Sequence, residues 1–273
     1  MGLIRAGIAA LAIAVCACLP AGAETRAERL GEALLLQEVV DILRQEGLAY
    51  GRSLDTDLLA GAGGRYFAAQ VARFYDSGAM LEVLNDSIAE HMSDKAIADS
   101  LAFFDSEEGR RILQFEVSAR IAMSDPAVED AALAAFQAAL DKGDPRAEDV
   151  VRFIEINDLA ERNVAGALSS NYRFFLGLVD GGGRKMSEAE IIDEVWGQED
   201  EIRVQTGTWL NSFLYLAYQP LSDEVMRAYL DYSDTAAGQA LNTALFDGFD
   251  EMYHAIYYAL GRAVAQAMQA SEL

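Results

Sequence analysis

The two histidines are the first residues to consider for chemistry, because imidazole can carry a proton or bind a metal. They are His91 and His254. Glu251 and His254 form an E-x-x-H pair, and Asp247 lies one turn earlier on the same side of a helix. Di-iron bundles need two such pairs, and His91 has no glutamate at that spacing. The sequence therefore predicts no metal site and favours a histidine packed among neighbouring tyrosines.

The sequence motifs of other common catalytic and phosphate-binding sites are missing. Both cysteines, Cys16 and Cys18, precede residue 24, so the remaining chain has no thiol and no disulfide. The glycine-rich stretches 61–64 and 181–183 lack the G-K-[ST] ending of a phosphate loop, so they are predicted to be helix-hairpin turns. There is no G-x-S-x-G elbow. A Ser-His-Asp site built from distant residues stays open, but no catalytic, cofactor-binding or metal-binding residue is predicted.

Aromatic residues are concentrated in the last quarter of the chain. They are Tyr215, Tyr218, Tyr229, Tyr232, Phe246, Phe249, Tyr253, Tyr257 and Tyr258. A tyrosine packs its ring while its hydroxyl seeks a polar partner. Two interpretations stay open: the rings join helices to one another, or they line a groove for an apolar ligand or for a helix of another envelope protein.

The elements that would position these residues contain a repeat. Residues 93–109, SDKAIADSLAFFDSEEG, return at 222–238 as SDEVMRAYLDYSDTAAG, with five of 17 positions identical. Unrelated segments of ordinary composition would match at about one position. The repeat predicts a tandem duplication, with one unit of about four helices over 24–143 and a second over 144–273. The turn at 141–145, DKGDP, is the predicted boundary.

Each repeated stretch ends on a glycine in the first turn of a helix. Gly109 follows Ser106 by three residues, and Gly238 follows Thr235 by three. Glycine costs up to about 1 kcal/mol in a helix, so its presence at both sites predicts a close backbone approach at a helix corner. The alternative is a surface corner that binds a peptide or ligand.

The first stretch resembles the signature of a bacterial domain-of-unknown-function family, number 2059. Phe103 to Arg111, FFDSEEGRR, is similar to its aromatic-aromatic-x-Ser-Pro-x-Gly-x-basic pattern, with Glu107 where proline is usual. The second stretch, around Tyr232 to Gln239, is weaker, with Ser233 in place of an aromatic residue and Ala240 in place of the basic one. The resemblance implies a small, exported, helical protein and carries over no catalytic residue.

The first 23 residues have the pattern of a cleaved signal peptide. Arg5 precedes an apolar run that Pro20 ends, and 21–23, AGA, is a cleavage site before Glu24. The sequence thus predicts a periplasmic or secreted protein, with no transmembrane segment in the mature chain. The alternative is a lipoprotein acylated at Cys18.

Composition limits the class of partner. The formal net charge is -23, which repels nucleic acid and anionic lipid. With 52% hydrophobic residues, the chain is too apolar to be a disordered acidic tail.

Apolar residues recur at helical spacing throughout, and no stretch alternates with period two, so the chain is predicted to be all-α. Helices are expected over 28–48, 66–88, 187–218 and 235–268, and from 144 through Leu168 until glycines 181–183 close the helix. Shorter helices are expected from 93 onward, with a further one starting at Pro126. Gly47 and Gly51 are expected to loosen the end of the first.

These observations favour a non-enzymatic periplasmic binding or interaction protein, which partners through its tyrosine-rich C-terminal helices. The alternative is a cell-envelope hydrolase with an active site that the sequence does not reveal. A Ser-His contact or converging carboxylates in a cleft would favour the hydrolase, and a continuous apolar groove would favour binding. The oligomeric state stays open.

Overall fold

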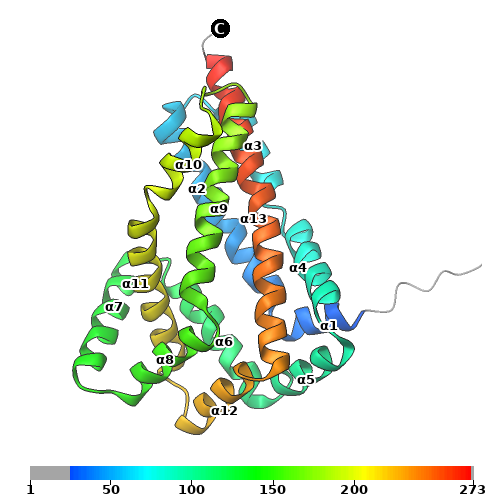
Figure 1. Ribbon diagram of the computed structural model, residues 1–273, viewed down its shortest axis with the longest axis vertical. Helices are drawn as coiled ribbons and strands as arrows, with labels where there is room; N and C mark the ends of the chain where they lie inside the picture. Colours follow the sequence, from blue (N-terminus) through cyan, green and yellow to red (C-terminus); the bar gives the residue numbers. More distant parts are fainter. Residues whose placement is uncertain (1–24, 272–273) are drawn as a thin grey trace, which may run out of the picture.

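A computed structural model (Figure 1) describes residues 25–271, which are helical with no strand among them. The helices are α1 (Arg26–Ala33), α2 (Leu36–Leu59), α3 (Gly64–Phe74), α4 (Ser77–His91), α5 (Asp94–Phe104), α6 (Glu107–Ala122), α7 (Pro126–Asp141), α8 (Pro145–Ile156), α9 (Leu159–Asp180), α10 (Glu188–Trp196), α11 (Glu199–Tyr218), α12 (Asp223–Ser233) and α13 (Ala236–Ser271). The all-α prediction is confirmed. The predicted cleavage site and Cys18 lie outside the described residues.

Helix α13 is the central element of a bundle-like body. It runs beside α9 and packs against α4 and α5, while α11 packs against α6, α7 and α9 (Figure 1). The largest buried cluster includes Leu30 and Ile112 as well as Tyr218 and Leu260, so the two predicted units share one core. Within residues 25–271, none of the helices combines the length and apolar character needed to cross a membrane.

Two helices predicted to be continuous are broken by a residue in the left-handed region. Leu35 (φ 56°) separates α1 from α2, and Asp158 (φ 50°) separates α8 from α9. Such a conformation costs a non-glycine residue about 1–2 kcal/mol. Long-range contacts compensate at the second break: Gln239 donates a hydrogen bond to the carbonyl of Ile156 (3.0 Å), and Asn242 donates one to the carbonyl of Asn157 (2.9 Å).

Two further predicted helices are also divided. The helix expected over 66–88 stops at Tyr75, because Asp76 accepts a hydrogen bond from the Ala79 amide and caps a new helix, α4. The helix expected over 187–218 is interrupted at Gly197, where α10 ends. The terminal helix agrees with its prediction, and so do the caps Asp125 and Asp144 with the following proline at the first helical position.

The expectation for Gly47 and Gly51 was wrong. Both lie inside α2, which continues to Leu59. A Cβ on Gly47 would lie 2.3 Å from the Tyr75 ring, and a Cβ on Gly51 would lie 2.6 Å from Cγ1 of Val71. The two glycines thus leave room for Val71 of α3 and for Tyr75, just after α3, to pack against α2. They do not loosen a helix end.

The repeated corners have the predicted close backbone approach. The Ser106 hydroxyl accepts a hydrogen bond from the Gly109 amide (2.9 Å), and the Thr235 hydroxyl accepts one from the Gly238 amide (3.0 Å). A Cβ on either glycine would lie 2.3 Å from a carbonyl oxygen of the preceding helix. The corners also meet: Phe103 and Tyr232, which occupy the same position in the two stretches, stack with ring centres 4.4 Å apart.

Replacing Gly109 or Gly238 with alanine should lower stability by about 1–3 kcal/mol, because the added methyl group meets backbone that cannot turn away. Gly207→Ala is the matched control. Nothing lies within 4 Å of a Cβ at this position in α11, so the change should stabilise by up to about 1 kcal/mol. Thermal melting of the three variants measures these changes in stability. Unchanged melting of Gly109→Ala and Gly238→Ala would show that close packing is not the role of these glycines.

Candidate ligand-binding cleft

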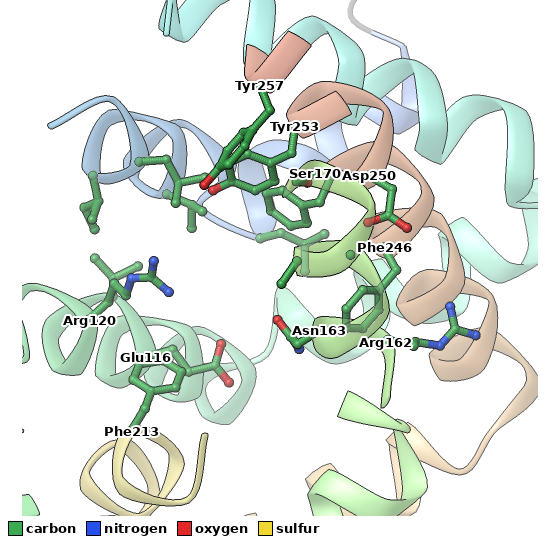
Figure 2. A pocket seen from close by; sticks show the side chains of 18 of the residues that line it. Glu116, Arg120, Arg162, Asn163, Ser170, Phe213, Phe246, Asp250, Tyr253 and Tyr257 are labelled. Carbon is green, nitrogen blue, oxygen red and sulfur yellow. The ribbon is translucent and has the colours of Figure 1, made fainter. Parts of the chain in front are cut away.

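A cleft opens between α2, α6, α9, α11 and α13, at the centre of the bundle (Figure 2). Its first lobe has a volume of about 440 Å³ and an adjoining second lobe about 340 Å³. Both values lie in the range of small-molecule sites. The two lobes share the wall residues Leu34, Val39, Leu113, Glu116, Asn163, Phe213, Phe246 and Phe249.

The broken helices help to form this cleft. Leu34 and Leu36 flank the left-handed residue Leu35, and both contribute to the wall of the second lobe. Asn157 and Leu159 flank Asp158 and contribute to the same wall. Non-glycine residues in strained conformations are often found at functional sites. Both helix breaks are therefore adjacent to residues of the wall of this lobe.

Glu116 is the carboxylate where the two lobes meet. Its Oε1 atom accepts hydrogen bonds from the hydroxyls of Tyr218 (2.7 Å) and Tyr229 (3.1 Å), which lie on α11 and α12. Among the described residues, Oε2 has no hydrogen-bond partner and no cation forms an ion pair with the carboxylate. In Figure 2 the carboxylate points into the cleft, toward Asn163.

The surroundings of Glu116 favour its neutral form. Burial raises the pKa of Glu116, and the hydrogen bonds from Tyr218 and Tyr229 oppose that rise. Burial, together with the nearby Glu116 charge, holds the pKa values of both tyrosines well above their ordinary value. Both tyrosines therefore keep their protons at neutral pH and act as donors. Glu116 thus has one oxygen that accepts two hydrogen bonds and a second oxygen that faces the cleft.

An ion pair separates the first lobe from a groove on the outer surface. Arg120 donates two hydrogen bonds to Glu46, from Nε to Oε1 (2.9 Å) and from Nη2 to Oε2 (2.7 Å). Its guanidinium group also lies 4.8 Å from the centre of the Trp209 ring. Arg120 contributes both to the first lobe and to this groove of about 650 Å³. Its charge is thus compensated by Glu46, outside the lobes.

The two histidines and the carboxylates near them do not converge on one site. His91 Nε2 lies 3.8 Å from Oδ2 of Asp247, so that carboxylate faces His91 and not the E-x-x-H pair. Within residues 25–271, no three His, Cys, Asp or Glu side chains gather closely enough to hold a metal ion. His254 lies beside Asp250, whose charge opposes the lowering of the His254 pKa by burial and by Arg173. Neither histidine contributes to the wall of either lobe.

A Ser-His contact does occur, between Ser87 and His91 on α4. Ser87 Oγ lies 3.1 Å from Nδ1 of His91, which completes a Ser87-His91-Asp247 chain. However, the Ser87 hydroxyl donates its proton to the carbonyl of Ala244 (2.7 Å), and the residue is only 4% exposed. A nucleophilic serine must give its proton to the histidine and reach a substrate. Ser87 does neither, and it serves to join α4 to α13.

The aromatic residues divide between the two interpretations. Tyr215, Tyr232 and Tyr258 join helices, since their hydroxyls donate to Asp144, Ser100 and Asp180. Tyr218 and Tyr229 join α11 and α12 to Glu116. The residues that face the first lobe are Phe246, Phe249, Tyr253 and Tyr257. Tyr218, Tyr229 and Tyr232 also line the second lobe. Seven of the nine aromatic residues therefore contribute to the walls of the cleft, together with Phe213 of α11.

The sequence contained a signal for Glu116 that was missed. Ile112, Leu113 and Ala119 place the buried face of α6 at helical spacing, and Glu116 lies on that same face. A carboxylate on the apolar face of a helix needs a buried partner. The identity of its partners has no local signal, because Tyr218 and Tyr229 are 102 and 113 residues away.

Compared with protein-family models, curated proteins and solved structures, the chain has no match. The resemblance to the domain-of-unknown-function family therefore stays a prediction, as does the tandem duplication.

Proposed function

We propose that this protein is an exported, non-enzymatic binding protein that holds an apolar small molecule in the central cleft. The observation that carries the proposal is the pair of adjoining lobes, walled mainly by aliphatic and aromatic side chains, with Glu116 as the carboxylate between them. Burial of an apolar molecule there would be favourable by about 25 cal/mol for each Å² removed from water. The signal-peptide pattern supports export, and the meeting of the two repeated corners supports a duplicated origin.

The alternative, a cell-envelope hydrolase, has one observation in its favour, the Ser87-His91 contact. The burial of Ser87 and its hydrogen bond to Ala244 count against it. The carboxylates of the cleft, Glu116 and Asp250, extend from different helices, and no hydrogen bond joins them. The binding proposal therefore accounts for more of the site.

Binding of the neutral fluorescent probe N-phenyl-1-naphthylamine tests this proposal. We expect saturable binding to the protein, weakened at least about tenfold by Ala167→Phe, because Ala167 of α9 lies in the wall of the first lobe and a larger ring would fill it. A tenfold loss corresponds to about 1.4 kcal/mol.

Ala134→Phe is the matched control, since Ala134 is exposed on α7, away from both lobes. It should bind the probe as the unaltered protein does. Circular dichroism and melting must show that both variants are folded. Absence of saturable binding, or equal binding by all three proteins, would overturn the proposal.

A further inference from the structure

The charge within the cleft is not balanced. Glu116 has one oxygen that faces the cleft without a partner, whereas Arg120 is already paired with Glu46. Asp250 and Arg162 also line the first lobe and carry opposite charges, and Arg162 opposes the rise of the Asp250 pKa on burial. These two therefore offset each other and leave Glu116 without a cation. A buried carboxylate is stable as an anion only when a cation or further donors reach it. A ligand that carries a positive charge would supply what the protein itself does not.

The walls near Glu116 also suit a cation. Phe213, Phe246 and Phe249 border both lobes, as Glu116 does. The faces of aromatic rings attract cations that lie within about 6 Å of the ring centre. One such contact already exists, because the Arg162 guanidinium lies 5.3 Å from the centre of the Phe246 ring. In Figure 2 that guanidinium lies on the far side of Phe246 from Glu116, so it leaves the carboxylate free.

The net charge of the whole molecule also favours a positively charged ligand. With a formal net charge of -23, its field concentrates cations near the surface and repels carboxylates and phosphates. Anionic amphiphiles, such as fatty acids, would therefore have to approach against the field and then meet Glu116. Among the amphiphiles that fit an apolar cleft, those with a cationic head group therefore meet no electrostatic repulsion, either from the protein surface or from Glu116.

We propose that the ligand of the cleft is an amphiphile with a protonated amine, which pairs with Oε2 of Glu116 while its apolar body lies among the phenylalanines of the lobes. This inference rests on the proposed binding function. In the complex the ammonium group donates to Oε2, and Tyr218 and Tyr229 continue to donate to Oε1. The tyrosines hold the carboxylate in place, and the ligand neutralises it.

Three probes with the same apolar chain test the inference, each used below its micelle concentration at pH 7 to displace N-phenyl-1-naphthylamine. We expect dodecylamine to displace the dye at a concentration at least about tenfold lower than dodecanol, and dodecanoate to be weaker than dodecanol. Glu116→Gln, which keeps the size and an acceptor for the tyrosines, should bring dodecylamine to within about threefold of dodecanol.

Glu108→Gln is the matched control, because it removes the same charge from an exposed position on the same helix, α6. It should retain the amine preference. The preference should also persist for the unaltered protein in 1 M salt, where surface charges are screened within about 3 Å. This second measurement tests the inference even when Glu116→Gln does not fold.

The outcomes separate the two proposals. Equal displacement by amine and alcohol, stronger displacement by dodecanoate, retention of the preference by Glu116→Gln, or its loss in 1 M salt would overturn the amine inference and leave the binding function standing. Failure of the dye and of all three probes to bind would overturn the binding function itself.

Discussion

Gly261→Ala should destabilise the protein by more than about 3 kcal/mol, the upper end of the usual cost of overpacking. Gly261 of α13 lies against α9, and a Cβ there would be 2.0 Å from the carbonyl oxygen of Phe174 and 2.8 Å from the Leu178 amide nitrogen. The opposite glycine, Gly177 of α9, would place a Cβ 2.1 Å from the carbonyl oxygen of Tyr258. Because both overlaps are with backbone, no side-chain rotation relieves them, and the two helices must separate.

Chemical denaturation with circular dichroism measures this loss, and Gly207→Ala again provides the control for helix propensity. The same change should weaken dye binding in whatever fraction stays folded, because α9 and α13 together form much of the first lobe. A Gly261→Ala protein as stable as the unaltered one would show that the close crossing of α9 and α13 is not needed for the fold.

Glu116→Gln should stabilise the ligand-free protein at pH 8 by about 1–3 kcal/mol, the usual cost of a buried polar group without its full set of partners. Burial raises the pKa of Glu116 in the folded protein above that in the unfolded chain. The carboxyl therefore imposes no penalty below the unfolded pKa, about 4.3. The penalty grows as the pH rises from the unfolded pKa toward the higher pKa of the folded state, and it is complete above that pKa.

The difference in unfolding free energy between Glu116→Gln and the unaltered protein should thus be small near pH 4 and grow toward pH 8. Measuring the difference removes the contributions of the other carboxylates, which both proteins share. Glu108→Gln should show no such trend, since that side chain is exposed. If the difference in unfolding free energy shrinks as the pH rises, the pKa of Glu116 is not raised by folding.

Local features of the fold were predictable from sequence because their causes are local. Asp125 with Pro126, and Asp144 with Pro145, begin helices through hydrogen bonds that span two residues. The close approach at Gly109 was predicted because glycine recurs at the same position of a repeated corner. The all-α class follows from helical spacing of apolar residues over the whole chain.

The breaks at Leu35 and Asp158 were not predictable in this way. The side chain that satisfies the carbonyl of Ile156 belongs to Gln239, 83 residues later, and the one that satisfies Asn157 belongs to Asn242, 85 residues later. Leu35 itself has no turn-forming character. The breaks lie in the wall of the second lobe, so the place of the cleft could not be derived from local patterns, although seven of its aromatic wall residues were among those singled out.

The pairing of Glu116 with Tyr218 and Tyr229 has a consequence for the order of folding. Synthesis proceeds from the N-terminus, so α6 exists long before the tyrosines that hydrogen-bond to its carboxylate. Until then the apolar face of α6 carries a carboxylate with neither tyrosine donor, and the central helix α13 is also missing. Contacts of such long range form late and slow the search for the native state. The core of the first half is therefore completed only when the last quarter of the chain arrives.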